Sequence, residues 1–196
     1  MKNTYYRIGL LLICMLFLAG CGGGVGAPGS TGGEDTGIVI QSAIVSSENI
    51  DIDTHIHACS PTTVEDGLFR ENATLDVAAT NLVPGSTDDP LAAASIEECT
   101  ITYKKANEDP AAPIIEDWTI YPNCQLVNGT TTCPVSLIDI ERKMRWWNDF
   151  SGGTFTPSEN PTHYVAVYRC KYVSTFGKTG FFQAELDIWL ADFNLC

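Results

Sequence analysis

The chain has 196 residues, eight of them cysteines, and its 24 acidic and 11 basic residues give a formal charge of −13. This length is enough for one substantial domain with its own core. The acidic balance argues against nucleic acid as a partner, because phosphate binding needs clustered cations. A hydrophobic content of 44% excludes wholesale disorder.

The first 20 residues are typical of an export signal. Lys2 and Arg7 form a positively charged start, and an apolar run from Ile8 to Leu18 follows it. The run is too short to cross a bilayer as a helix, which needs about 20 apolar residues. We therefore predict that residues 1–20 are a signal peptide that is removed on export.

The end of this segment, Leu18-Ala19-Gly20-Cys21, resembles the lipobox of bacterial lipoproteins. In that family the cysteine thiol is diacylated, the peptide is cut before it, and the new amino group is acylated. The resemblance implies palmitate-type chains on Cys21, and several such chains anchor a protein stably. Gly22 rather than Asp follows, which by the same resemblance favours the outer membrane of a bacterial cell envelope, with the body facing the periplasm or the exterior.

Residues 21–37 follow as the lipidated cysteine and a flexible glycine-rich tether. Removal of Lys2 and Arg7 makes the mature protein two units more acidic, so anionic lipid repels the body. We expect residues 38–196 to form a single domain that stands off the membrane on its tether.

Six cysteines remain in this domain, and an even number in an exported protein indicates three disulfides. They are Cys59, Cys99, Cys124, Cys133, Cys170 and Cys196. One pairing follows from spacing, because Asn128-Gly129 is a strong signal for a two-residue type I′ hairpin. Counting outward from that turn places Cys124 opposite Cys133, close enough to bridge.

Apolar alternation with turn signals predicts an all-β domain of about seven to nine strands, which suggests a β-sandwich. The expected strands are residues 37–45, 49–58, 69–80, 96–105, 114–121, 163–173 and 180–192, with the Asn128-Gly129 hairpin between the fifth and the sixth. Only the stretch from Asp139 to Asp149 has helical character, and it could be a short helix or a turn crossing between the sheets.

Cys99, Trp118 and the later Tyr168-Arg169-Cys170 resemble the immunoglobulin pattern of a cysteine, a core tryptophan, and a tyrosine two residues before a second cysteine. The Cys99-to-Trp118 spacing is longer than in that family. The resemblance implies an immunoglobulin-like β-sandwich in which a Cys99–Cys170 disulfide joins the two sheets and Trp118 packs on it. It leaves Cys59 and Cys196 as the third pair.

The segment Ile50-Asp51-Ile52-Asp53-Thr54-His55-Ile56-His57 contains two candidate metal ligands, His55 and His57. A strand would place both imidazoles and both carboxylates on one face, where they suit a divalent metal. A third ligand would have to come from elsewhere in the chain. We favour the other interpretation, the solvated face of an amphipathic strand.

A candidate binding patch combines three basic residues with two tryptophans: Arg142, Lys143, Arg145, Trp146 and Trp147. Paired tryptophans could stack on a sugar ring, and the cations could meet an acidic partner or glycan. The alternative is that one tryptophan caps the core while the charges solvate its rim.

No nucleophile elbow, zinc-protease helix or phosphate-binding loop occurs in the body. We therefore expect a lipid-anchored envelope protein with a non-catalytic binding or structural role and no cofactor. Its partners would be the membrane, through the lipid, and another envelope protein or a polysaccharide. A metal-binding protein using His55 and His57, or a carbohydrate-binding lipoprotein, is the alternative.

Overall fold

The computed structural model describes residues 36–55, 68–81 and 94–193. Within these ranges the chain is mostly β, as predicted, with one α-helix. The elements are β1 Ile38–Ser46, β2 Asp51–Asp53, β3 Glu71–Asn81, β4 Ala94–Lys105, β5 Trp118–Ile120, β6 Cys124–Leu126, β7 Gly129–Ile138, α3 Ile140–Ser151, β8 Thr162–Ser174 and β9 Thr179–Ala191.

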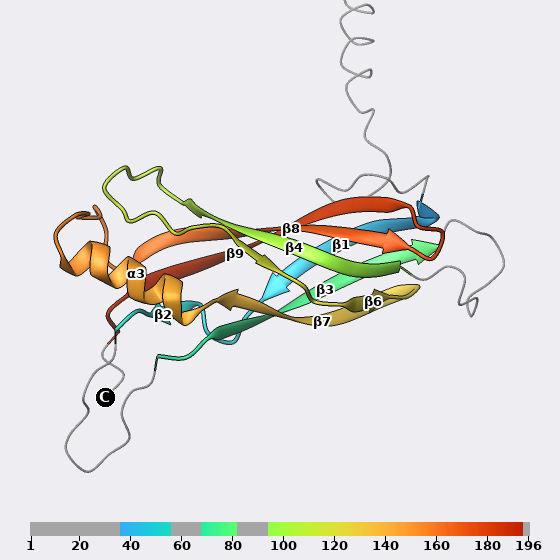
Figure 1. Ribbon diagram of the computed structural model, residues 1–196, viewed down its shortest axis with the longest axis horizontal. Coiled ribbons are helices and arrows are strands. Elements are labelled where there is room, and N and C mark those ends of the chain that lie inside the picture. Colours follow the sequence, from blue (N-terminus) through green and yellow to red (C-terminus); the bar gives the residue numbers. More distant parts are fainter. Residues whose placement is uncertain (1–35, 56–67, 82–93, 194–196) are drawn as a thin grey trace, which may run out of the picture.

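The strands form two sheets (Figure 1). One has the order β1-β3-β7, and the other has the order β2-β9-β8-β4-β5, with β6 also pairing with β4. All of these pairs are antiparallel except β2 with β9. Helix α3 connects β7 to β8 at one end of the molecule, so it carries the chain from one sheet to the other.

Alternation of apolar and polar residues explains how both sheets enclose one core. On β3, Leu75 and Val77 are buried while Asp76 between them is not, because successive side chains of a strand point to opposite faces. On β8, Tyr168 and Tyr172 are buried in the same way. These residues belong to a single buried cluster to which both sheets contribute.

Two tyrosines of the larger sheet hydrogen-bond to the smaller one. Tyr103 on β4 donates its hydroxyl proton to the carbonyl of Leu137 at 2.6 Å, and Tyr168 on β8 donates to the carbonyl of Ser136 at 2.9 Å. Both acceptors lie on β7, an edge strand of the smaller sheet. The bonds satisfy polar groups that would otherwise be costly to bury.

Burial raises the pKa of Tyr103 and of Tyr168 above the ordinary tyrosine value of 10.0. The folded protein therefore holds these protons at a pH where the unfolded chain releases them. This contribution to stability is complete below about pH 10 and is lost as the pH rises above it, by up to about 1.4 kcal/mol per tyrosine and pH unit. We expect the urea midpoint of unfolding to fall steeply above about pH 10.

The control for this prediction is the double variant Tyr103→Phe/Tyr168→Phe. It is less stable at neutral pH, but its urea midpoint falls less between about pH 9 and 11, because two of the titrating groups are gone. Equal slopes for the two proteins would contradict this account.

The structure contains the Cys124–Cys133 disulfide, with 5.9 Å between the Cα atoms, but not the predicted hairpin around it. Cys124 lies on β6, which pairs with β4, and Cys133 lies on β7, which pairs with β3. The turn is also not type I′, because Gly129 has a positive φ of 106° and Asn128 does not have a positive φ. This disulfide therefore joins the two sheets.

The Cys99–Cys170 disulfide is also present, but it lies within one sheet. The two cysteines are cross-strand partners on β4 and β8, with 4.0 Å between their Cα atoms. The immunoglobulin resemblance implied a bond between the sheets, and that placement is wrong, because Cys99 lies on a strand that is the direct neighbour of β8. The third expected pair, Cys59 with Cys196, lies outside the described residues, as does Cys21.

Two predicted strands are shorter than expected. The run 49–58 gives only β2, Asp51–Asp53, within its described part, and the run 114–121 gives only β5, Trp118–Ile120. Of the two alternatives for the stretch from Asp139 to Asp149, a short helix or a turn, the structure has the helix, α3. Asp139 caps it, because its carboxylate accepts the backbone N–H of Arg142 at 2.9 Å.

Candidate functional site

Trp146 of the predicted patch is a core residue. Its side chain is 1% exposed, and its indole N–H donates to the hydroxyl of Tyr164 at 2.9 Å. Tyr164 in turn donates to the carbonyl of Pro113 at 2.8 Å. The paired stacking platform is therefore wrong, and the alternative, that one tryptophan caps the core, is what the structure has. Because a helix has 3.6 residues per turn, the apolar residues of α3 share one face. That face packs against the core, and Trp146 is part of it.

Lys143 is buried as well, although a lysine in a basic run is normally expected at the surface. Its side chain is 1% exposed and its ammonium lies 2.6 Å from the carboxylate of Glu71. This ion pair attaches α3 to the first residue of β3. The ammonium cannot meet an external partner, so the prediction that Lys143 belongs to a binding patch is wrong.

The remaining patch residues are engaged within the protein. Arg145 forms ion pairs with Glu116 and Glu141. Trp147 is half-buried, and its ring centroid lies 4.5 Å from that of His55. Arg142 forms an ion pair with Asp139. Residues 142–147 therefore form a structural cluster rather than a free docking face.

His55 is the described half of the predicted metal pair, since His57 lies outside the described residues. Its Nδ1 lies 3.9 Å from a carboxylate oxygen of Asp192. Asp53 accepts the backbone N–H groups of His55 and Phe193, each at 3.2 Å. Among the residues that the structure describes, no group of three or more His, Cys, Asp or Glu side chains is placed to hold a metal ion.

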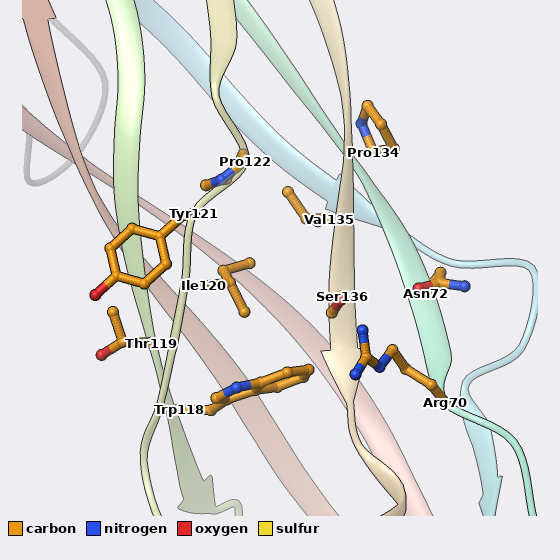
Figure 2. Close-up of a pocket in the computed structure, with 10 residues that line it drawn as sticks. All are labelled: Arg70, Asn72, Trp118, Thr119, Ile120, Tyr121, Pro122, Pro134, Val135 and Ser136. Atoms are coloured by element: carbon orange, nitrogen blue, oxygen red, sulfur yellow. The ribbon is translucent and has the colours of Figure 1, made fainter.

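A groove of about 450 Å³ lies where the edges of the two sheets approach each other (Figure 2). Its walls come from three segments: the start of β3, the stretch from β5 to Pro122, and the second half of β7. The lining residues are Arg70, Asn72, Trp118, Thr119, Ile120, Tyr121, Pro122, Pro134, Val135 and Ser136. Figure 2 shows Trp118 and Ile120 pointing toward β7, with Tyr121 on the other side of its strand.

Trp118 is the central side chain of this groove. It is half-buried on β5, and its ring lies near two guanidinium groups, with the Cζ of Arg142 at 5.3 Å and that of Arg70 at 5.6 Å from the ring centroid. Both distances fall within the range of cation–π attraction. The resemblance implied a buried core tryptophan; Trp118 is instead only partly buried, and it packs against the core from β5, an edge strand of the larger sheet among the described residues.

The two arginines differ in what else they contact. Arg142 is held by the carboxylate of Asp139 at 2.6 Å and by the carbonyls of Glu116 and Asp117 at 2.9 and 2.8 Å. Arg70 is exposed and forms no hydrogen bond or ion pair within the part of the chain that the structure describes. Arg142 therefore fixes the indole in place, while the guanidinium of Arg70 remains able to bind an anion.

Two other pockets are weaker candidates for a binding site. One of about 500 Å³ lies on the outer face of α3 around Met144, and its only cation, Arg145, is already paired. The other, of about 390 Å³, lies by Ser174, and its acid, Glu97, is paired with Lys171. The Trp118 groove combines an aromatic ring with a cation, Arg70, that has no carboxylate partner among the described residues, and it is the candidate site.

Sequence reasoning identified Trp118 but not its neighbours in the groove. Arg70 lies 48 positions earlier, in a stretch with no motif. Only the pairing of β4 with β5, and of β3 with β7, brings these residues to one place.

No family model and no curated protein matches the chain. Among solved structures, the structural-genomics target SoR45 is 15% identical, with 83% of this chain and 92% of that chain covered, at a TM-score of 0.33. A putative late embryogenesis abundant (LEA) protein is 13% identical, with 96% and 86% covered, at a TM-score of 0.33. Within the described ranges, no helix has the length and apolar character needed to cross a membrane.

Proposed function

We propose that this protein is a lipid-anchored component of a bacterial cell envelope with a non-catalytic binding role, and that it binds through the Trp118 groove. The anchor is supported by the match of Leu18-Ala19-Gly20-Cys21 to the lipobox, directly behind an apolar run. Gly22 supports the outer membrane as its location by the same resemblance.

The domain that carries the groove is an immunoglobulin-like β-sandwich in this proposal. The order of its strands supports this, because β9-β8-β4 stand in one sheet as strands G, F and C do in that fold, and β1-β3-β7 stand in the other as A, B and E do. The disulfide within the larger sheet departs from the immunoglobulin pattern. Such sandwiches serve many functions, so the role is argued from the groove rather than from the fold.

The observation that carries the binding role is the pairing of Trp118 with an exposed Arg70 that has no anionic partner in the described chain. Tryptophan and arginine are the residue types that contribute most to recognition sites. The indole is held in advance by Arg142, so little conformational entropy is lost when a ligand packs against it.

The test is photo-cross-linking from the rim of the groove in cells that make the full chain. A benzophenone amino acid replaces Tyr121, which lines the groove and is 65% exposed. The matched control replaces Phe176, an aromatic residue that is 61% exposed in the turn between β8 and β9. We expect an envelope component to be captured from position 121 and not from position 176. Equal capture from both positions, or none from 121, would refute binding at the groove.

A further inference from the structure

The groove differs in charge from the rest of this acidic protein. The chain has 24 acidic residues, yet none of the ten residues that line the groove is Asp or Glu. Among the described residues that line the groove, Arg70 supplies the only charge. The three basic residues of α3 are each paired with a carboxylate: Arg142 with Asp139, Lys143 with Glu71, and Arg145 with Glu116. A ligand that complements this groove therefore carries a negative charge where it meets Arg70.

The guanidinium group of Arg70 favours some anions over others as the ligand of this groove. Its planar array of N–H donors matches a carboxylate or a phosphate through paired hydrogen bonds. Only one such group faces this groove, so it matches a single carboxylate better than the dense charge of a polyphosphate.

The other lining residues favour a ring with hydroxyl groups attached to that carboxylate. The half-buried Trp118, backed by the buried Ile120 and Val135, gives the groove an apolar wall, which suits the carbon face of a sugar ring (Figure 2). The side chains of Asn72 and Ser136 add donors and acceptors for hydroxyl groups.

An extended acidic peptide fits less well, because prolines interrupt both edges beside the groove. Pro122 follows β5, and Pro134 lies on β7. A proline has no N–H to donate to an added strand, so natural sheets use it to block edge pairing. On β7, the carbonyls of Ser136 and Leu137 already accept the hydroxyls of Tyr168 and Tyr103.

We infer that the groove binds a uronic acid unit of an envelope polysaccharide, with Arg70 on the sugar carboxylate and Trp118 against its ring. This inference rests on the proposed binding role and specifies the ligand of the same site. The sequence pattern indicated carbohydrate binding at Trp146 and Trp147, whereas this inference assigns it to Trp118.

The experiment measures binding of the full lipidated chain, purified in detergent with EDTA present, to three polymers. Polygalacturonate carries sugar carboxylates, its methyl ester carries the same rings without charge, and poly-L-glutamate carries carboxylates on a peptide. The variants are Arg70→Gln and Arg169→Gln. Arg169 is a matched control, because it too is exposed, forms no described ion pair, and lies 5.4 Å from an aromatic ring, that of Phe181 on β9.

We expect polygalacturonate to bind more tightly than poly-L-glutamate, which has no sugar ring to pack against Trp118. It should also bind at least about tenfold more tightly than its methyl ester, which cannot form a charge-assisted hydrogen bond through a carboxylate. Arg70→Gln should remove that advantage, while Arg169→Gln should change affinity by less than about twofold. Equal losses of affinity in Arg70→Gln and Arg169→Gln would show that net charge alone explains the binding, and would overturn the inference.

Two further outcomes separate this inference from the proposed function. Tighter binding of poly-L-glutamate, lost in Arg70→Gln, would overturn the sugar ligand but keep binding at the groove. If position 121 captures an envelope component but polygalacturonate binds no more tightly than the other two polymers, the sugar ligand is again overturned and binding at the groove is kept. If position 121 captures nothing and no polymer binds, both the inference and the proposed function fail.

Discussion

Replacement of Glu71 by alanine is expected to destabilise the fold by about 3 kcal/mol, because it leaves the Lys143 ammonium without its partner in the interior. The side chain of Lys143 is 1% exposed, whereas that of Glu71 is 20% exposed. Water can reach the glutamate but not the lysine, so the loss belongs near the lower end of the range for broken buried pairs. Urea unfolding of the variant and the parent protein measures it.

Two further variants separate the buried ion pair from general effects of charge. Glu97→Ala breaks the Lys171–Glu97 pair, whose side chains are 36% and 47% exposed, and should cost less than about 1 kcal/mol. Adding Lys143→Met to Glu71→Ala should restore much of the lost stability, because an apolar side chain of similar length then occupies the site. A double variant as unstable as Glu71→Ala alone would show that the loss does not come from the unpaired ammonium.

Replacement of Cys21 by serine is expected to abolish lipid attachment completely. A hydroxyl does not replace the acylated thiol, and in the lipoprotein family the cut before this position accompanies acylation, so residues 1–20 should stay on the chain. Metabolic labelling with an alkyne fatty acid, followed by the mass of the purified protein, measures both effects. The parent protein should carry several acyl chains, which together hold it on the membrane.

Cys14→Ser is the matched control for that experiment, because Cys14 lies within the apolar run and should leave with the predicted signal peptide. This variant should be labelled and processed like the parent protein. Retention of the label in Cys21→Ser, or its loss in Cys14→Ser, would contradict the assignment of the anchor.

The two disulfides show where reasoning from the sequence ends. Counting outward from an Asn128-Gly129 hairpin predicts the pairing of Cys124 with Cys133. The bond is present although that hairpin is not, because a nine-residue separation keeps the two cysteines near each other. The same separation says nothing about which sheet each cysteine joins. β6 pairs with β4 and β7 pairs with β3, so a bond expected inside a hairpin joins the two sheets instead.

The binding patch shows the same limit on α3. The basic and aromatic residues at 142–147 suggested an exposed face, but Lys143 and Trp146 point into the protein. A helical period of 3.6 residues predicts that residues three apart share a face, yet the sequence does not say which face meets the core. The partners that decide it, Glu71 and Tyr164, come from β3 and β8.

By itself the sequence determined the local features of this protein: strands from the alternation of residues such as Leu75 and Val77, a helix that begins after Asp139, and the acidic balance. These depend on neighbours along the chain. The tertiary structure alone decided the groove, because Arg70 reaches Trp118 only after β3 and β5 take their places in separate sheets. Strand pairing between distant segments depends on the packing of the whole core, and no local pattern encodes it.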